Sequence, residues 1–273
     1  MILEDVQNRP DTRGIALDAV GISQLRYPAA VAARECGKQE TVASFTLTVD
    51  LSGSVKGTHL SRFVHLVHEY AADLSVASLA QMAQDLKERL GSGLARIEAE
   101  FPYFVERAAP ITGARAMLEC QGRLTVEAYA DVVRSLVGVT VPVTSVCPCS
   151  KAISDYGAHN QRGYIRVDSW LSDVVAQAGV PLSLEELIEV AESCGSSPVY
   201  PLLKRADERH VTMTAHDNPV FVEDMARSMV YALRDDSRIS AFTVEVTNDE
   251  SIHNHAAFAR VTWPANGADG HAR

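Results

Sequence analysis

The sequence lacks several features that would define a class of protein. Its 273 residues include only 5 cysteines, an odd number without the regular spacing of a disulfide framework. No apolar run approaches the roughly 18 residues of a membrane-spanning helix. The first residues, MILEDVQNRPDTRG, lack the basic and then apolar pattern of a signal peptide. We therefore expect a cytoplasmic protein that has reduced cysteines and does not bind a membrane.

Positive charge is also scarce. The chain has 25 Lys and Arg against 35 Asp and Glu, which gives a net charge of −10 at pH 7. This excess of negative charge argues against broad electrostatic attraction to nucleic acid, although a local basic pocket can still hold a small phosphorylated molecule. The hydrophobic fraction of 47% is ordinary for a soluble globular protein and supplies a sizeable core.

Hydrophobic periodicity predicts both helices and strands. Apolar residues at three- and four-residue spacing predict amphipathic helices over 61–74, 78–91, 183–195 and 218–236. The third has Ser183 as its N-cap and Glu186 three residues later, the pattern of a capping box. Alternating or Val- and Thr-rich segments predict strands over 40–51, 95–108, 114–121, 124–133, 135–147, 163–171, 239–250 and 255–264.

The predicted elements run twice through the order strand, helix, helix, strand. This recurrence predicts an α+β protein with antiparallel sheets, each covered on one face by a helix pair. It places the first module at residues 1–122 and the second at residues 123–273. No low-complexity linker separates the two.

The segment VPVTSVCPCSK places two cysteines at the end of a predicted strand, with Pro148 between them. The C-x-C spacing differs from the C-x-x-C of thioredoxin-like redox pairs. A catalytic zinc site takes three protein ligands and keeps one position open for water, and Cys147 and His159 can supply two of the three. The alternative is a pair of buried thiols beside a solvated histidine.

Near the C-terminus, Glu250, His253 and His255 lie at the junction of two predicted strands. In extended backbone the two histidines share a face. Two imidazoles beside a carboxylate suit proton transfer near neutral pH, or metal coordination. The alternative is a polar hairpin turn.

A third polar cluster, KGTHLSR, runs from a predicted strand into a predicted helix. Lys56, His59 and Arg62 there are candidates for an anion site, because the free N–H groups and the dipole at a helix N-terminus favour phosphate. Helix caps and surface charges are the alternative interpretation. The charged run LLKRADERH, residues 202–210, is typical of a solvated face.

Several longer motifs together resemble one family, the prokaryotic GTP cyclohydrolase IB or FolE2-type enzymes. They cover nearly the whole chain in the order of that family. The matching segments are DVQN (5–8), VGISQLRYP (20–28), KGTHLSRF (56–63), PVTSVCPCSKAIS (142–154), GAHNQRG (157–163), YPLLKRADE (200–208), NPVFVEDMAR (218–227) and ESIHNHAAFA (250–259).

The resemblance implies a bimodular tunnelling fold (T-fold) and a homotetramer with active sites at subunit interfaces. It also implies the conversion of GTP and water to 7,8-dihydroneopterin triphosphate and formate, the entry to folate and other pterins. In that reaction a metal-activated water attacks C8 of the purine. The cofactor implied is a divalent metal, zinc in the first place, with iron or manganese as alternatives.

Residue by residue, the resemblance implies that Cys147, His159 and Glu208 are the metal ligands. Glu223 is similar to the T-fold glutamate that anchors the purine, because a carboxylate can accept hydrogen bonds from both the ring N–H and the 2-amino group of guanine.

The resemblance also implies catalytic roles and further substrate contacts. Glu250, His253 and His255 correspond to an acid–base cluster that acts beside Cys147. Lys56, His59 and Arg62 correspond to contacts with the triphosphate.

The chain departs from the family pattern at Ala206, where proline is usual, at Met213, where an acidic residue is usual, and at Glu40, where histidine is typical. None of these positions is a predicted ligand. The departures leave two alternatives beside the GTP cyclohydrolase interpretation. One is a diverged T-fold hydrolase that acts on another purine-like compound, and the other is a non-catalytic protein that binds a pterin or purine.

Overall fold

The computed structural model describes residues 7, 9–34, 36–130, 132–172 and 182–264. The chain divides into two compact units, which are described separately. Unit 1 comprises Met1–Pro102 and Arg123–Leu136, and unit 2 comprises Tyr103–Gly122 and Val137–Arg273. Three long strands contribute residues to both units: β3 (Leu94–Ala108), β4 (Arg115–Tyr129) and β5 (Val132–Val146).

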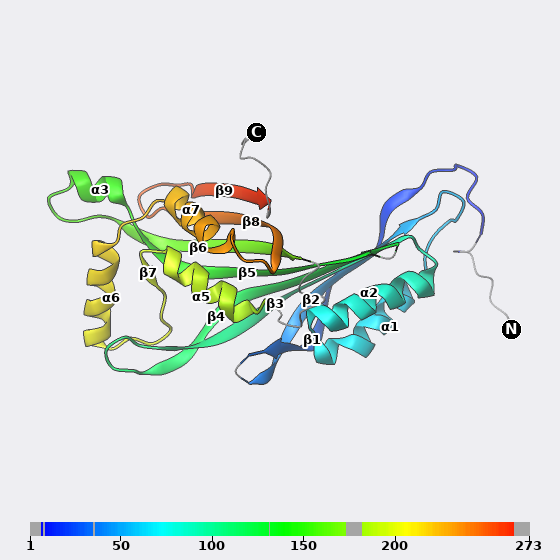
Figure 1. Ribbon diagram of the computed structural model, residues 1–273, viewed down its shortest axis with the longest axis horizontal. Helices are drawn as coiled ribbons and strands as arrows, with labels where there is room; N and C mark the ends of the chain where they lie inside the picture. The colour runs from blue at the N-terminus through cyan, green and yellow to red at the C-terminus, as the bar shows by residue number, and fades with distance from the viewer. Residues whose placement is uncertain (1–6, 8, 35, 131, 173–181, 265–273) are drawn as a thin grey trace. The chain divides into compact units, whose positions relative to one another are not determined.

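Unit 1 is an antiparallel sheet with a helix pair (Figure 1). Strand β1 (Leu17–Ala33) pairs with β2 (Gly37–Leu51), and β2 pairs with β3. Every second residue of β2 from Ala43 to Val49 is buried, as expected for a strand with one face in the core. The sheet then continues with β4 and β5.

The helices of unit 1 are α1 (Leu60–Tyr70) and α2 (Val76–Leu90), joined by the short 3₁₀ helix η1 (Ala71–Asp73). Both helices bury an apolar stripe, and Figure 1 shows them side by side. Helix α2 begins with a capping box and ends at Gly91 in the left-handed conformation, with φ of 63°.

Unit 2 has the strand order β3, β4, β5, β6, β8, β9, with β7 paired to β5. The strands are β6 (Asn160–Leu171), β7 (Ser197–Pro198), β8 (Ile239–Asn248) and β9 (Ala257–Pro264). The helices are α3 (Pro148–Ile153), α5 (Leu184–Cys194), α6 (Arg205–Asp217) and α7 (Val222–Leu233).

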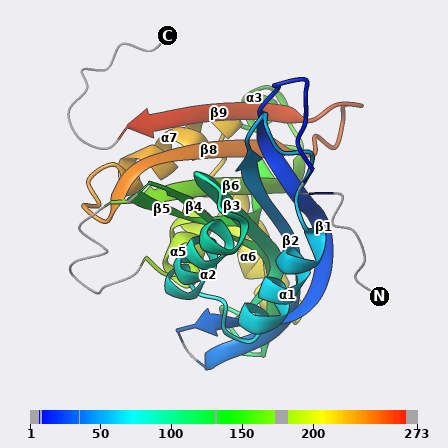
Figure 2. The same ribbon diagram turned by 90° about the vertical axis from the view of Figure 1, so that its right-hand side faces the viewer.

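Helices α5 and α7 pack together, and α7 also packs on β8 and β9 (Figure 2). Met225, Met229 and Leu233 of α7 are buried. The α+β class, with antiparallel strands and helix pairs, is confirmed. Among the described helices, none combines the length and the hydropathy that a bilayer span requires.

Several local predictions need correction. The predicted strands over 114–121 and 124–133 belong largely to one strand, β4, because Gly122 continues the strand and does not break it. Residue 122 therefore lies inside β4, and the division into modules 1–122 and 123–273 stays a prediction. Helix α7 begins at Val222 and not at the predicted residue 218, so Pro219 precedes the helix and Phe221 is its exposed N-cap residue. Neither β1 nor α6 was expected.

The capping box of Ser183 and Glu186 is confirmed at the start of α5. The helix ends at Cys194, and Gly195 follows it in an extended conformation, not in the left-handed one. A Cβ at Gly195 would lie 2.8 Å from Cβ of Val143, so this glycine permits close packing against β5.

Candidate functional site

The end of β5 fixes the position of Cys147. The strand stops at Val146, and Cys147 is the N-cap of α3, with Pro148 as the first helical residue. The Sγ atom of Cys147 accepts a hydrogen bond from the backbone N–H of Ser150 at 3.4 Å. This contact fixes the sulfur of Cys147 at the start of α3. Cys149, two residues further along, is exposed and has no such contact among the described residues.

The backbone brings His159 next to Cys147. The N–H of Cys147 donates to the carbonyl oxygen of His159 at 3.1 Å, and the N–H of His159 donates to Oγ of Ser150 at 3.2 Å. The side chain of His159 is only 13% exposed. Two of the three predicted metal ligands are thus neighbours at the junction of β5, α3 and β6.

Polar side chains surround the Nδ1 side of His159. Nδ1 is 2.8 Å from Oε1 of Gln161 and 3.7 Å from Oε2 of Glu250. The amide of Gln161 lies 3.3 Å from Oγ of Ser145 and 3.5 Å from Oε1 of Glu250. The amide of Asn248, at the end of β8, donates to Oγ of Ser145 at 2.8 Å. The carboxylate of Glu250 therefore lies beside the predicted ligand His159.

Glu208 lies in the first turn of α6, where its side chain is exposed. The preceding residue, Asp207, is fully buried and holds this helix end against the turn between β3 and β4. Its carboxylate accepts hydrogen bonds from the N–H groups of Ile111 and Thr112 at 2.9 and 2.8 Å, and from Oγ1 of Thr112 at 2.7 Å. Burial alone would raise the pKa of Asp207, but these hydrogen bonds hold it well below its ordinary value.

Glu223 is exposed in the first turn of α7. The chain just before this helix is tied to the end of β5, because the N–H of Val220 donates to the carbonyl oxygen of Val146 at 3.2 Å. The helix that carries Glu223, the predicted purine anchor, therefore follows a segment that is hydrogen-bonded to the strand end next to Cys147.

Among the described residues, no three His, Cys, Asp or Glu side chains of one chain are grouped so that they could hold a metal ion. The structure brings Cys147 and His159 together, but Glu208 does not form such a group with them. The three-ligand metal site stays a prediction.

His253 and His255 lie in the exposed segment between β8 and β9. Their rings stack, with centroids 5.0 Å apart and an angle of 17° between the ring planes. The N–H of His253 donates to the backbone carbonyl oxygen of Glu250 at 3.4 Å. The carboxylate of Glu250 lies 3.7 Å from Nδ1 of His159. The acid–base roles of the three residues stay predictions.

The predicted anion site lies in unit 1. Lys56 is exposed, and His59 is the half-buried N-cap residue of α1. Nη1 of Arg62 donates to the carbonyl oxygen of Arg89 at 2.7 Å, in the last turn of α2. A cation there satisfies a helix C-terminal carbonyl group. Arg62 thus has a structural contact in the unit, and triphosphate binding by these three residues stays a prediction.

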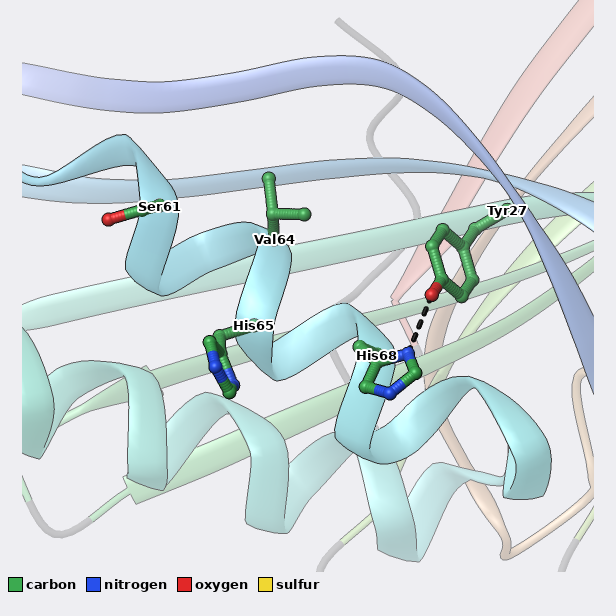
Figure 3. Close-up of a pocket in the computed structure, with 5 residues that line it drawn as sticks. All are labelled: Tyr27, Ser61, Val64, His65 and His68. Carbon is green, nitrogen blue, oxygen red and sulfur yellow. Dashed lines mark hydrogen bonds between the residues drawn. The ribbon is translucent and has the colours of Figure 1, made fainter.

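A surface pocket of about 460 Å³ also lies in unit 1, beside α1 (Figure 3). It is lined by Tyr27, Ser61, Val64, His65 and His68. The hydroxyl of Tyr27 and Nδ1 of His68 are hydrogen-bonded at 2.7 Å. None of the five is a predicted site residue.

Sequence reasoning missed three residues of the site: Gln161, Ser145 and Asn248. Gln161 had a usable signal, because it lies two residues after His159 at the start of a strand and so faces the same side. Ser145 and Asn248 come from β5 and β8 and meet only in the folded unit.

Comparison with known proteins identifies the family. The model of the family described as type I GTP cyclohydrolase folE2 matches residues 3–259. A GTP cyclohydrolase FolE2 from Methylococcus capsulatus is 44% identical over 269 residues, which cover 98% of this chain and 98% of that protein. One from Geobacter sulfurreducens is 44% identical over 259 residues, which cover 95% of this chain and 97% of that protein.

Similar solved structures include two of much lower sequence identity. Uricase from Arthrobacter globiformis has a TM-score of 0.51 and 9% identity, with 93% of this chain and 96% of that chain covered. Urate oxidase from Bacillus subtilis 168 has a TM-score of 0.51 and 7% identity, with 90% of this chain and 98% of that chain covered. At such identity the likeness shows the fold alone, and it agrees with the tunnelling fold that the motifs implied.

The family model and the relatives together confirm the resemblance that the motifs carried. The chain belongs to the type I GTP cyclohydrolase FolE2 family.

Proposed function

We propose that this protein is a metal-dependent GTP cyclohydrolase that converts GTP and water to 7,8-dihydroneopterin triphosphate and formate. A relative named GTP cyclohydrolase FolE2 matches at 44% identity over 98% of both chains, which supports this activity. The observation that carries the proposal is the pairing of Cys147 with His159 at the end of β5. A thiolate at a helix start beside a sheltered imidazole is a suitable pair of metal ligands.

The donor chemistry fits a divalent cation, zinc in the first place, with iron or manganese as alternatives. Cys147, His159 and Glu208 would hold it. When bound, such an ion lowers the pKa of its water to about 7 and so supplies a hydroxide nucleophile at neutral pH.

The other predicted site residues bind the substrate and move protons. The Glu223 carboxylate accepts hydrogen bonds from the ring N–H and the 2-amino group of guanine. Lys56, His59 and Arg62 offer positive charge to the triphosphate.

Proton transfer falls to the stacked histidines. His253 or His255 donates a proton to the ring nitrogen as the bond between C8 and N9 breaks, since imidazole titrates near neutral pH. Glu250 supports the site from the Nδ1 side of His159.

We also propose that the active sites lie at subunit interfaces of a homotetramer. Glu208 and Glu223 are exposed in one chain, and among the residues described, one chain does not group three metal ligands. A neighbouring copy would complete the ligand set and enclose the substrate. Sedimentation of the metal-loaded protein tests the tetramer.

Formate release from GTP tests the activity. We expect the zinc-reconstituted protein to release one formate for each GTP and to yield a neopterin product that fluoresces after oxidation. Cys147→Ala should lose both zinc and turnover, whereas the matched control Cys149→Ala keeps them. Zinc binding without formate release would favour a purine or pterin binder, and release from another purine alone would favour a diverged hydrolase.

The role of Glu223 has a separate test. Glu223→Ala should lose turnover and GTP binding but retain zinc, because the carboxylate contacts the base and not the metal. Glu88→Ala, at another exposed helical glutamate, is the control. Unaltered turnover in Glu223→Ala would remove the purine-anchor assignment.

A further inference from the structure

A chain of buried and half-buried amide and hydroxyl groups lies behind His159. We call it the amide relay, and it consists of Asn248, Ser145 and Gln161. Asn248 is 2% exposed and Ser145 is 1% exposed. The relay links the core of the sheet to Nδ1 of His159 through contacts of 2.8, 3.3 and 2.8 Å.

The hydroxyl of Ser145 fixes the direction of the relay. Its single proton points to the carbonyl oxygen of Val220, 3.4 Å away, which can only accept a hydrogen bond. Oγ of Ser145 must therefore accept from both neighbours. The NH₂ groups of Asn248 and Gln161 consequently face Ser145.

Glu250 gives a second reason for the same orientation of Gln161. Its Oε1 atom lies 3.5 Å from Nε2 of Gln161, and a carboxylate accepts hydrogen bonds but does not donate them. With Nε2 directed to Glu250 and Ser145, the Oε1 atom of Gln161 is left facing Nδ1 of His159 at 2.8 Å.

The orientation of Gln161 determines the tautomer of His159. An amide oxygen only accepts, so Nδ1 must carry the proton, and in the neutral ring the lone pair then resides on Nε2. Outer hydrogen bonds of this kind orient metal-binding imidazoles and raise their affinity.

The backbone opposite Asn248 keeps the relay in place. Gly163 on β6 pairs with Asn248 on β8. A Cβ at Gly163 would lie 2.5 Å from Oδ1 of Asn248. Any residue other than glycine at position 163 would therefore overlap with the side chain of Asn248.

We propose that Gln161 is a positioning residue that keeps His159 in the Nδ1–H tautomer and thereby presents Nε2 to the catalytic cation. This inference rests on the proposed function only for the presence of the cation. The tautomer itself is a property of the metal-free protein.

The tautomer can be measured directly by long-range ¹H–¹⁵N NMR of the full-length, metal-free protein labelled with ¹⁵N-histidine. At pH 8, above the ordinary imidazole pKa of about 6.5, most histidines are neutral. His159→Gln identifies the signals of His159 by their loss. We expect the Nδ1–H pattern in the wild type, and the Nε2–H pattern there would overturn the proposal.

Two variants and a control test the role of Gln161. Gln161→Met has a similar shape but only a weak thioether acceptor in place of the amide oxygen, so the Nδ1–H preference should be lost and the Kd for Zn²⁺, measured by chelator competition, should rise about 10- to 100-fold. Gln161→Glu keeps an oxygen opposite Nδ1 and should retain the tautomer, but its carboxylate cannot donate to Ser145 or Glu250, so this variant tests the tautomer alone. Gln121→Met, at an exposed strand position, should change neither.

The results separate this proposal from the proposed function. If Gln161→Met leaves either the tautomer or the Zn²⁺ affinity unchanged, the positioning role is wrong. The wild-type tautomer needs no variant, so the test stands even where Gln161→Met does not fold. Normal tautomer and Zn²⁺ results without formate release from GTP would contradict the proposed function and leave the role of Gln161 intact.

Discussion

Gly163→Ala perturbs the amide relay without touching a predicted metal ligand. The new Cβ would lie 2.5 Å from Oδ1 of Asn248 and 3.2 Å from Cγ2 of Val143. Ordinary contacts begin near 3.4 Å, so the Asn248 side chain or the strand must move by about 0.9 Å. The methyl group points at a buried amide in a paired strand, and both Asn248 and Val143 are buried.

Overpacking of this kind costs typically about 1–3 kcal/mol of unfolding free energy. Part of that cost arises if Asn248 turns away from Ser145, because a hydrogen bond of 2.8 Å is then lost, worth about 0.5–1.5 kcal/mol net. Ser145 would hold Gln161 less firmly, and we expect the Kd for Zn²⁺ to rise, though less than in Gln161→Met.

Urea denaturation of the metal-free protein measures the stability change, and chelator competition measures the Zn²⁺ affinity. Gly57→Ala is the control, because the nearest atom to its new Cβ is Cγ of Gln7 at 3.7 Å. We expect no loss of stability there. A Gly163→Ala protein within about 0.5 kcal/mol of the wild type, with unchanged Zn²⁺ affinity, would refute the reasoning, since surface changes away from packed groups have effects of that size.

Two further predictions concern thiols and acid stability. In native protein at pH 7.5, iodoacetamide should modify exposed Cys149 and spare Cys120, because burial raises the pKa of the Cys120 thiol to about 12. Zn²⁺ should protect Cys147 and leave Cys149 reactive, as read by peptide mass spectrometry, and equal protection of both would contradict the assignment. Hydrogen bonds from Arg238 hold the pKa of Asp236 below its ordinary value of 3.8. This contribution to stability is present above that value and is lost as pH falls through the lower folded-state pKa. Arg238→Met should therefore be less stable than the wild type at pH 7, with a difference that shrinks below pH 3.8 in urea titrations, and a constant difference would contradict this.

The elements that were predicted correctly are those whose signals lie within a short stretch of the sequence. Helix α5 has both halves of its capping box within its first residues, and α1, α2 and α7 carry an apolar stripe along their length. The place of Cys147 at a strand end was predictable because Pro148 follows it directly and stiffens the turn there.

Strand β1 and helix α6 depend on tertiary contacts. Strand β1 is largely exposed at its start, and its register with β2 shifts near Gln24, which has a φ of 57°. The sequence of β1 therefore shows no regular alternation of apolar and polar residues. In α6 only Asp207 and Ala215 are buried, so no apolar stripe exists, and Asp207 is held by residues 95 and 96 positions earlier.

The same limit applies to the candidate site. The spacing of Cys147 and His159 suggested a pair, because only the short helix α3 and the turn after it separate them. The contact between Asn248 and Ser145 joins residues 103 positions apart, and spacing gives no sign of it. The predicted third ligand, Glu208, begins a helix that sequence periodicity did not reveal.

Zinc K-edge X-ray absorption of the reconstituted protein tests the proposed metal centre most directly. We predict one sulfur at about 2.3 Å together with nitrogen or oxygen ligands at about 2.0–2.2 Å. The sulfur contribution should disappear in Cys147→Ser and persist in Cys149→Ser. A zinc ion without sulfur in the wild type, or one whose sulfur survives the loss of Cys147, would contradict the assignment of the metal to the end of β5.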